Sequence, residues 1–87
     1  MSQPFIGQLV HARGRLGIRN GAEVVPAVVT RVWQRVTIGS HDVWLVNLHV
    51  FHDGPETVWR SSVYLFNTEV EARSFPGWNA WRVPAFP

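Results

Sequence analysis

Arginine and tryptophan lie close together at two places in this sequence, and together they could bind an anion that carries an aromatic ring. Arg31, Trp33 and Arg35 occupy every second position of one segment, whereas Trp59 and Arg60 are neighbours in another. Arginine offers a planar set of donors that fits phosphate, and tryptophan offers a flat face on which a base stacks. We therefore predict that these five residues form a ligand-binding surface for a nucleotide-like anion.

A structural alternative exists for the same residues. The tryptophans can fill the core or a subunit interface, while the arginines stay solvated or pair with Glu69 and Glu71. All eight basic residues are arginine, which reflects either coding bias in a GC-rich genome or selection for bidentate contacts. The absence of lysine excludes a P-loop lysine and a Schiff-base mechanism.

Two histidine–aspartate pairs, His41-Asp42 and His52-Asp53, are candidates for metal ligands. Both pairs lie in segments expected to be hairpin turns, where aspartate close to glycine is common. His49 and His52 are three positions apart on an expected strand and so face opposite sides, and His41 can meet His52 only across the ends of the sheet. A metal needs three or four converging ligands, so we expect no metal and no cofactor.

Catalytic groups are equally weakly indicated. Ser61 and Ser62 are adjacent, but no Gly-x-Ser-x-Gly elbow surrounds them and no single histidine stands out as their base. Five of the six acidic residues lie in or beside expected turns and loops, so no buried carboxylate pair can be identified. We predict that the protein is not an enzyme.

The chain is short and rich in aromatic residues. Its 87 residues suit a single domain over residues 1–87. The core of so short a chain is thin, and small domains often bury additional surface by self-association. Five tryptophans and five phenylalanines exceed what such a core hides, so some should lie at an interface or in a groove. No cysteine is present, which rules out disulfides and cysteine-based metal sites. A homo-oligomer is the expectation.

Charge is distributed unevenly along the sequence. Residues 1–35 carry five arginines and one glutamate, a net charge of +4, whereas residues 36–87 carry three arginines and five acids, a net charge of −2. This asymmetry favours head-to-tail assembly, or an anion held by the basic half. The N-terminus does not resemble a signal peptide, and the longest apolar stretch, residues 24–29, is too short to span a membrane. We expect an intracellular protein with no membrane partner.

The elements that must position these side chains are three consecutive β-strands, at residues 27–36, 43–51 and 57–66. They are dense in valine, tryptophan, leucine and phenylalanine, and the turns at residues 38–42 and 52–55 contain glycine, aspartate, serine and proline. We assign Val28 and Val32 to the core, which leaves Arg31 and Trp33 on the opposite face. Both stripes of residues 43–51 are largely apolar, so this strand should be covered on both faces, by a partner chain or a packed tail.

The flanking segments complete a barrel. Residues 5–12 and 78–83 are expected strands, and Thr68 with Glu71 predicts a capped helical turn over residues 68–73. The glycine-rich segment at residues 13–23 is either an anion-binding nest or a solvated loop. Together these elements predict an all-β fold, a small five-stranded and partly open barrel of the Src-homology-3-like type. An oligonucleotide-binding barrel is the alternative.

Three segments carry a resemblance to a known group of proteins. They are PAVVTRV at residues 26–32, VNLHVFHDG at residues 46–54, and GWNAW at residues 77–81 with Pro84. This pattern resembles small uncharacterised β-barrel proteins of tailed bacteriophages and prophages, although Arg82 and Val83 intervene before the closing proline here. The resemblance implies a viral origin and a small barrel, and it implies no activity and no catalytic residues.

Taken together, these features predict a non-enzymatic, self-associating phage-type binding module in the host cytoplasm. It would evade host defence by capturing an anionic nucleotide-like ligand or by occluding a host protein. The alternative is a virion structural or assembly protein, such as a head-decoration or connector component. Single-stranded nucleic acid is a less favoured partner, because a net charge of +2 is too small for nucleic-acid coating.

Overall fold

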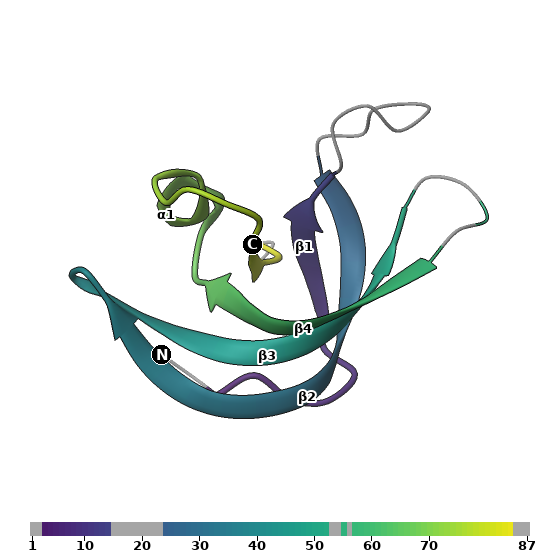
Figure 1. The fold of residues 1–87 in the computed structure, drawn as a ribbon, viewed down its shortest axis with the longest axis horizontal. Coiled ribbons are helices and arrows are strands. Elements are labelled where there is room, and N and C mark those ends of the chain that lie inside the picture. The colour runs from purple at the N-terminus through teal and green to yellow at the C-terminus, as the bar shows by residue number, and fades with distance from the viewer. Residues whose placement is uncertain (1–2, 15–23, 53–54, 56, 85–87) are drawn as a thin grey trace.

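The computed structural model describes residues 3–14, 24–52, 55 and 57–84 (Figure 1). The elements are β1 (Leu9–Arg13), β2 (Val24–Ile38), β3 (His41–Phe51), β4 (Thr57–Phe66), α1 (Glu69–Arg73) and β5 (Ala80–Arg82). The three predicted consecutive strands are confirmed, and the predicted first and last strands are present but shorter. Over the described residues, no helix has the length and apolar character needed to cross a membrane.

The five strands form a closed barrel in the order β1-β2-β3-β4-β5. Neighbouring strands are antiparallel except β4 and β5, which run parallel through two residue pairs. Closure comes from β5, which pairs with β1 at His11↔Trp81 and Ala12↔Ala80. The predicted small five-stranded all-β barrel is therefore confirmed, and it is closed rather than partly open.

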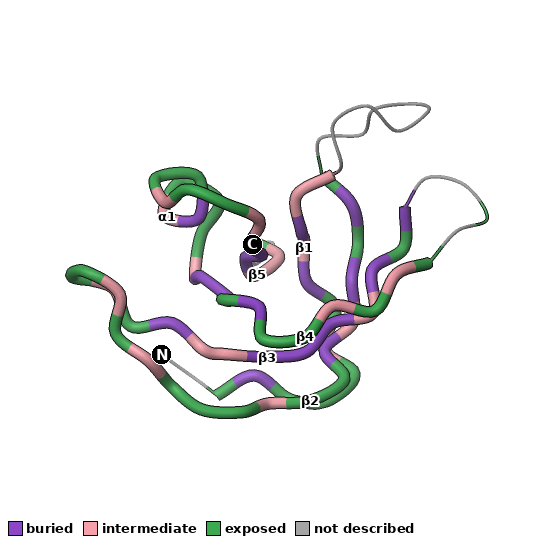
Figure 2. Tube along the Cα trace, in the orientation of Figure 1, coloured by how far each residue is buried: buried purple, intermediate pink, exposed green. Residues whose placement is uncertain are grey.

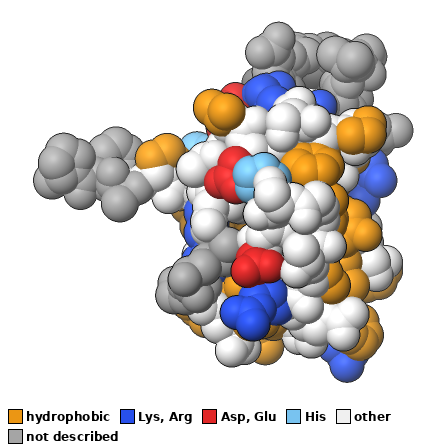
Figure 3. Space-filling model, turned by 90° about the vertical axis from the view of Figure 1, so that its left-hand side faces the viewer, with side chains coloured by type: hydrophobic (Ala, Val, Ile, Leu, Met, Phe, Trp, Pro, Cys, Tyr) orange, Lys and Arg blue, Asp and Glu red, His pale blue; other side chains and the backbone are white. Residues whose placement is uncertain are grey.

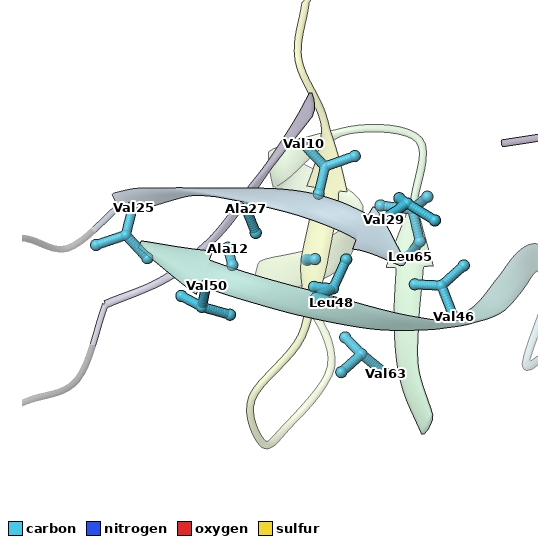
Figure 4. Close-up of a cluster of buried hydrophobic side chains, with 11 residues drawn as sticks. Val10, Ala12, Val25, Ala27, Val29, Val46, Leu48, Val50, Val63 and Leu65 are labelled. Atoms are coloured by element: carbon cyan, nitrogen blue, oxygen red, sulfur yellow. The ribbon is translucent and has the colours of Figure 1, made fainter. Parts of the chain in front are cut away.

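The interior of the barrel is filled by small aliphatic side chains (Figure 4). On the central strand β3, Val46, Leu48 and Val50 alternate with outward residues and are fully buried. The other strands contribute Val10, Ala12, Val25, Ala27, Val29, Val63, Leu65 and Ala80. Compact aliphatic residues of this kind suit the narrow interior of a small barrel.

The assignment of Val28 to the core is wrong. Its neighbours Ala27 and Val29 are fully buried, whereas Val28 is half-buried and lies opposite the outward residue His49. One extra residue, Thr30, separates the pairs that Val29 and Arg31 make with β3. Such a bulge shifts the alternation by one position, so the later residue Val32 does pack against the core as predicted.

A second cluster lies on the outer face of the barrel, where α1 covers it. Val43, Phe66, Ala72 and Trp81 are buried there, and Val36, Ile38 and Phe75 pack around them. The predicted helical turn is confirmed, because Thr68 caps α1 by accepting a hydrogen bond from the backbone N–H of Glu71. This segment is the packed cover predicted for β3, but it reaches only one end of the strand.

One arginine and one asparagine side chain connect α1 to the barrel. The guanidinium of Arg13, on β1, donates to the carbonyl oxygens of Ala72 at 3.1 Å and Phe75 at 3.3 Å. Asn79 donates to the same carbonyl of Ala72 at 2.9 Å, and it also accepts a hydrogen bond from Arg13. These bonds connect the barrel to the Ala72 carbonyl, which also accepts the backbone N–H of Phe75, and to the Phe75 carbonyl just beyond the helix.

Candidate functional site

The other end of the outer face carries apolar and aromatic side chains that remain accessible. The strand register places Leu9, Val28, His49 and Trp59 side by side across β1 to β4. Leu9 is 54% exposed and Trp59 is 59% exposed, and Phe51 packs its ring against His49 with centroids 5.2 Å apart. We call these five residues the open face, because no described segment covers it as α1 covers the second cluster.

Arg31 and Trp33 form a stacked pair on the same side of the sheet. The guanidinium carbon of Arg31 lies 3.8 Å from the centroid of the Trp33 ring, which is a cation–π contact. Both residues are exposed, so the edge of the guanidinium can still donate hydrogen bonds outward. The pair therefore offers a cation and an aromatic surface as one unit.

Asn47, on the neighbouring strand β3, holds the Trp33 ring of this pair in place. Its side chain is buried, at 6% exposure, and its Oδ1 accepts hydrogen bonds from Trp33 Nε1 at 2.8 Å and from the Ser62 backbone N–H at 3.0 Å. A register shift in β2 lies at Trp33, and another separates the pairs of Val46 and Leu48 with β4. Ser62 takes a φ of 57°, a conformation that non-glycine residues rarely adopt. One buried amide thus holds two irregular strands and the Trp33 ring.

Asn47 is the residue that sequence reasoning missed. The signal available was a single polar residue between Val46 and Leu48, on a stripe of β3 otherwise rich in apolar residues. A polar side chain in such a place needs a hydrogen-bond partner once it is buried. The partners belong to two other strands, so they could not be identified from the spacing.

The five predicted ligand-binding residues do not share one face, which corrects that prediction. Arg31, Trp33 and Trp59 lie on the outer side, since Trp33 binds Asn47 and Trp59 pairs with the outward His49. Arg35 pairs with Trp44, whose ring packs against the core, and Arg60 pairs with the core residue Leu48. The bulge at Trp33 separates Arg35 from Arg31, and strict alternation on β4 separates Trp59 from Arg60.

Two arginines on the inner side have aromatic or apolar surroundings of their own. The guanidinium carbon of Arg60 lies 4.9 Å from the ring centroid of Trp78, which packs against the core cluster. Arg82 pairs with the core residue Val10, and burial lowers the pKa of its guanidinium from the ordinary value. Neither arginine belongs to the open face.

The acidic residues of the described chain gather at the α1 end. Glu69 pairs with Arg73 and Glu71 pairs with His41, each at 2.6 Å, and Figure 3 shows acidic, basic and histidine side chains side by side on that side of the molecule. The ion pairs found among the described residues therefore do not involve Arg31 or Arg35, although Arg73 does pair with Glu69.

The remaining candidates have structural surroundings or fall outside the described residues. His41 is engaged by Glu71, and across the described ranges no three histidine, aspartate or glutamate side chains come together as a metal site would require. Asp53 and most of the glycine-rich segment predicted as an anion nest, residues 15–23, lie outside the described residues. Comparisons with protein-family models, with curated proteins and with solved structures gave no match to this chain.

Proposed function

We propose that this protein is a non-enzymatic binding module that captures an anionic, nucleotide-like ligand on the Arg31–Trp33 pair and the adjacent open face. The observation that carries the proposal is the stacked pair itself, fixed by the buried amide of Asn47. A guanidinium bound to a fixed ring is already oriented before a ligand arrives. Less conformational entropy is then lost on binding, which raises affinity.

The two halves of the ligand would meet different groups. A phosphate suits the outward N–H groups of Arg31, because guanidinium and phosphate oxygens match in a bidentate arrangement. A base suits the exposed ring of Trp59 or the face formed by the stacked pair, because aromatic stacking tolerates any base. This division supports a nucleotide better than a simple anion.

The open face also supports self-association. Leu9, Phe51 and Trp59 are each more than two-fifths exposed, and a cluster of large apolar side chains is typical of a protein contact surface. In the phage setting that the sequence resemblance implies, an oligomer of such modules would hold a host-defence signal in the host cytoplasm and keep it from its receptor.

Native mass spectrometry with a mixed panel of linear and cyclic nucleotides tests the proposal. A defined oligomer that retains a nucleotide is the expected result. Arg31→Ala should then weaken binding at least about tenfold, because a hydrogen bond to a charged group contributes roughly 1.5–3 kcal/mol. The matched control is Arg73→Ala, an exposed arginine on α1 that should leave the affinity unchanged. Retention of the nucleotide with equal affinity by both variants would exclude the site.

A second candidate function rests on the open face alone. Exposed aromatic residues suit a contact repeated in a particle, and in this alternative the protein decorates a phage head or joins a connector. High copy number in purified particles, together with no retained nucleotide, is the result that would favour this structural role.

A further inference from the structure

The long strand β2 has an edge that is paired over only part of its length. β1 pairs with residues 24–28, and Gly7 and Gln8 exchange backbone hydrogen bonds with Val29. From Thr30 to Ile38, the backbone hydrogen bonds found among the described residues join β2 only to β3. In Figure 1, β2 accordingly runs on past β1 toward the turn that joins it to β3.

The same stretch is open to solvent. None of its nine residues is buried, and six of them are exposed, as the colouring of β2 in Figure 2 shows. The exposed residues are Thr30, Arg31, Trp33, Gln34, Arg35 and Thr37. After the bulge at Trp33, residues 34–38 pair with β3 without a further shift, so their backbone has regular strand geometry.

Free strand edges are usually blocked in proteins, because they pair readily with other chains. Residues 34–38 contain no proline and no glycine, and valine, threonine and isoleucine among them favour strands. The charges on the edge are Arg31 on the outer side and Arg35 on the inner side. The nearby Asp42, on β3, already accepts a hydrogen bond from the Thr37 hydroxyl at 2.9 Å.

These charges decide which partner suits the edge. Two copies of this chain joined through residues 34–38 would place both Arg35 side chains in one short ladder, which like-charge repulsion disfavours. An extended segment with acidic side chains would instead meet an arginine on each face of the sheet. We propose that the β2 edge at residues 34–38 binds an extended acidic peptide segment of a partner protein, which adds to the sheet as a strand.

This inference does not depend on nucleotide capture. Both proposals use Arg31, but strand addition also needs the backbone groups of residues 34–38 and Arg35, whereas the nucleotide proposal uses the Trp33 ring and excludes Arg35. The variant Arg35→Glu should therefore weaken binding of an acidic peptide and leave nucleotide retention unchanged.

The probes are two capped seven-residue peptides of threonine and valine, one with two adjacent glutamates and one with two adjacent lysines, so that one charge lies on each face of the added strand. NMR titration should show saturable binding of the glutamate peptide only. Alternate amides of residues 34–38, those directed away from β3, should become protected from hydrogen exchange on binding.

Charge-reversal variants sharpen the test. Arg35→Glu should lower the affinity for the glutamate peptide about tenfold. The double variant Arg31→Glu, Arg35→Glu should bind the lysine peptide more tightly than the glutamate peptide. Arg73→Glu changes the net charge of the chain equally, on α1, and should have no effect. Equal affinity for the two peptides would overturn the proposal. Amide protection confined to the open face would also overturn it. So would protection of the amides of residues 34–38 that rises with protein concentration in the absence of peptide, because a second copy of the chain would then occupy the edge.

Discussion

Two tryptophans on the outer face of the barrel have opposite surroundings. Trp81 on β5 is 1% exposed beneath α1, whereas Trp59 on β4 is 59% exposed on the open face. Both are tryptophans on outward-facing strand positions, so residue type does not explain the difference in their exposure. The difference lies in the segment that follows β4, which folds back over Trp81 and does not reach Trp59.

The comparison shows how little chain is needed to turn an outer face into core. A helix of five residues and the following Phe75 are sufficient, because Arg13 and Asn79 hold the last turn in place. The open face has no such cover among the described residues. We interpret the covered end as part of the stability of the fold and the open end as available for binding.

The largest expected effect is the contrast between the two tryptophans. Trp81→Ala should lower the free energy of unfolding by about 3–5 kcal/mol, because it leaves a cavity beneath α1. Trp59→Ala should change it by no more than about 0.5 kcal/mol in a monomer, because the ring is already exposed. Urea titration followed by circular dichroism measures both, with Trp81→Phe as a milder variant where the alanine variant does not fold. Similar losses for Trp59 and Trp81 would contradict the contrast.

The attachment of α1 is the next test. Arg13→Gln should cost about 2 kcal/mol of unfolding free energy, because it removes charge-assisted hydrogen bonds to the Ala72 and Phe75 carbonyls. The substitution should speed up hydrogen exchange at the amides of α1 more than at the amides of the rest of the barrel. The control Arg35→Gln, on the exposed part of β2, should leave both quantities close to those of the unmodified protein. Unchanged exchange in α1 would show that Arg13 does not hold the cover.

Asn47 provides the corresponding test at the open end. Asn47→Ala should cost about 1–2 kcal/mol, because the Ser62 N–H and the Trp33 Nε1–H lose their acceptor. The indole N–H resonance of Trp33 should move toward the position of a solvated tryptophan. Asn67→Ala, a half-buried asparagine after β4, is the matched control, with an expected change below about 0.5 kcal/mol. A Trp33 resonance that stays in place would mean that the ring is fixed by other contacts.

A smaller effect is expected for the ion pair between the start of β3 and α1. Glu71→Gln removes the charge that pairs with His41, whose side chain is one-third exposed. Partly exposed pairs contribute little, so the loss should be below about 1 kcal/mol. Glu69→Gln, which breaks a pair within α1, should cost still less because it links no separate elements. A loss of stability for Glu71→Gln as large as that for Arg13→Gln would instead make the pair with His41 on β3 a main support of α1.

Several features could be predicted because they depend on neighbouring residues. The strands over residues 27–36, 43–51 and 57–66 follow from their composition and from the turns between them, and β4 has the predicted bounds. The capped turn before Arg73 follows from the spacing of Thr68 and Glu71. Of the five residues predicted to bind a ligand, the structure brings Arg31 and Trp33 together, whereas Arg35 and Arg60 lie on the inner side of the sheet.

By itself, the amino-acid sequence determined the strand segments, their order along the chain and the helix cap, because these depend on interactions within a few residues. The tertiary structure decided which side of the sheet each side chain faces. A bulge of one residue at Thr30 or Trp33 reverses that side, and Asn47 on β3 accepts hydrogen bonds from Trp33 at one of these bulges and from Ser62 on β4. It also decided which tryptophan became core, because the cover reaches Trp81 through bonds between residues far apart in the sequence.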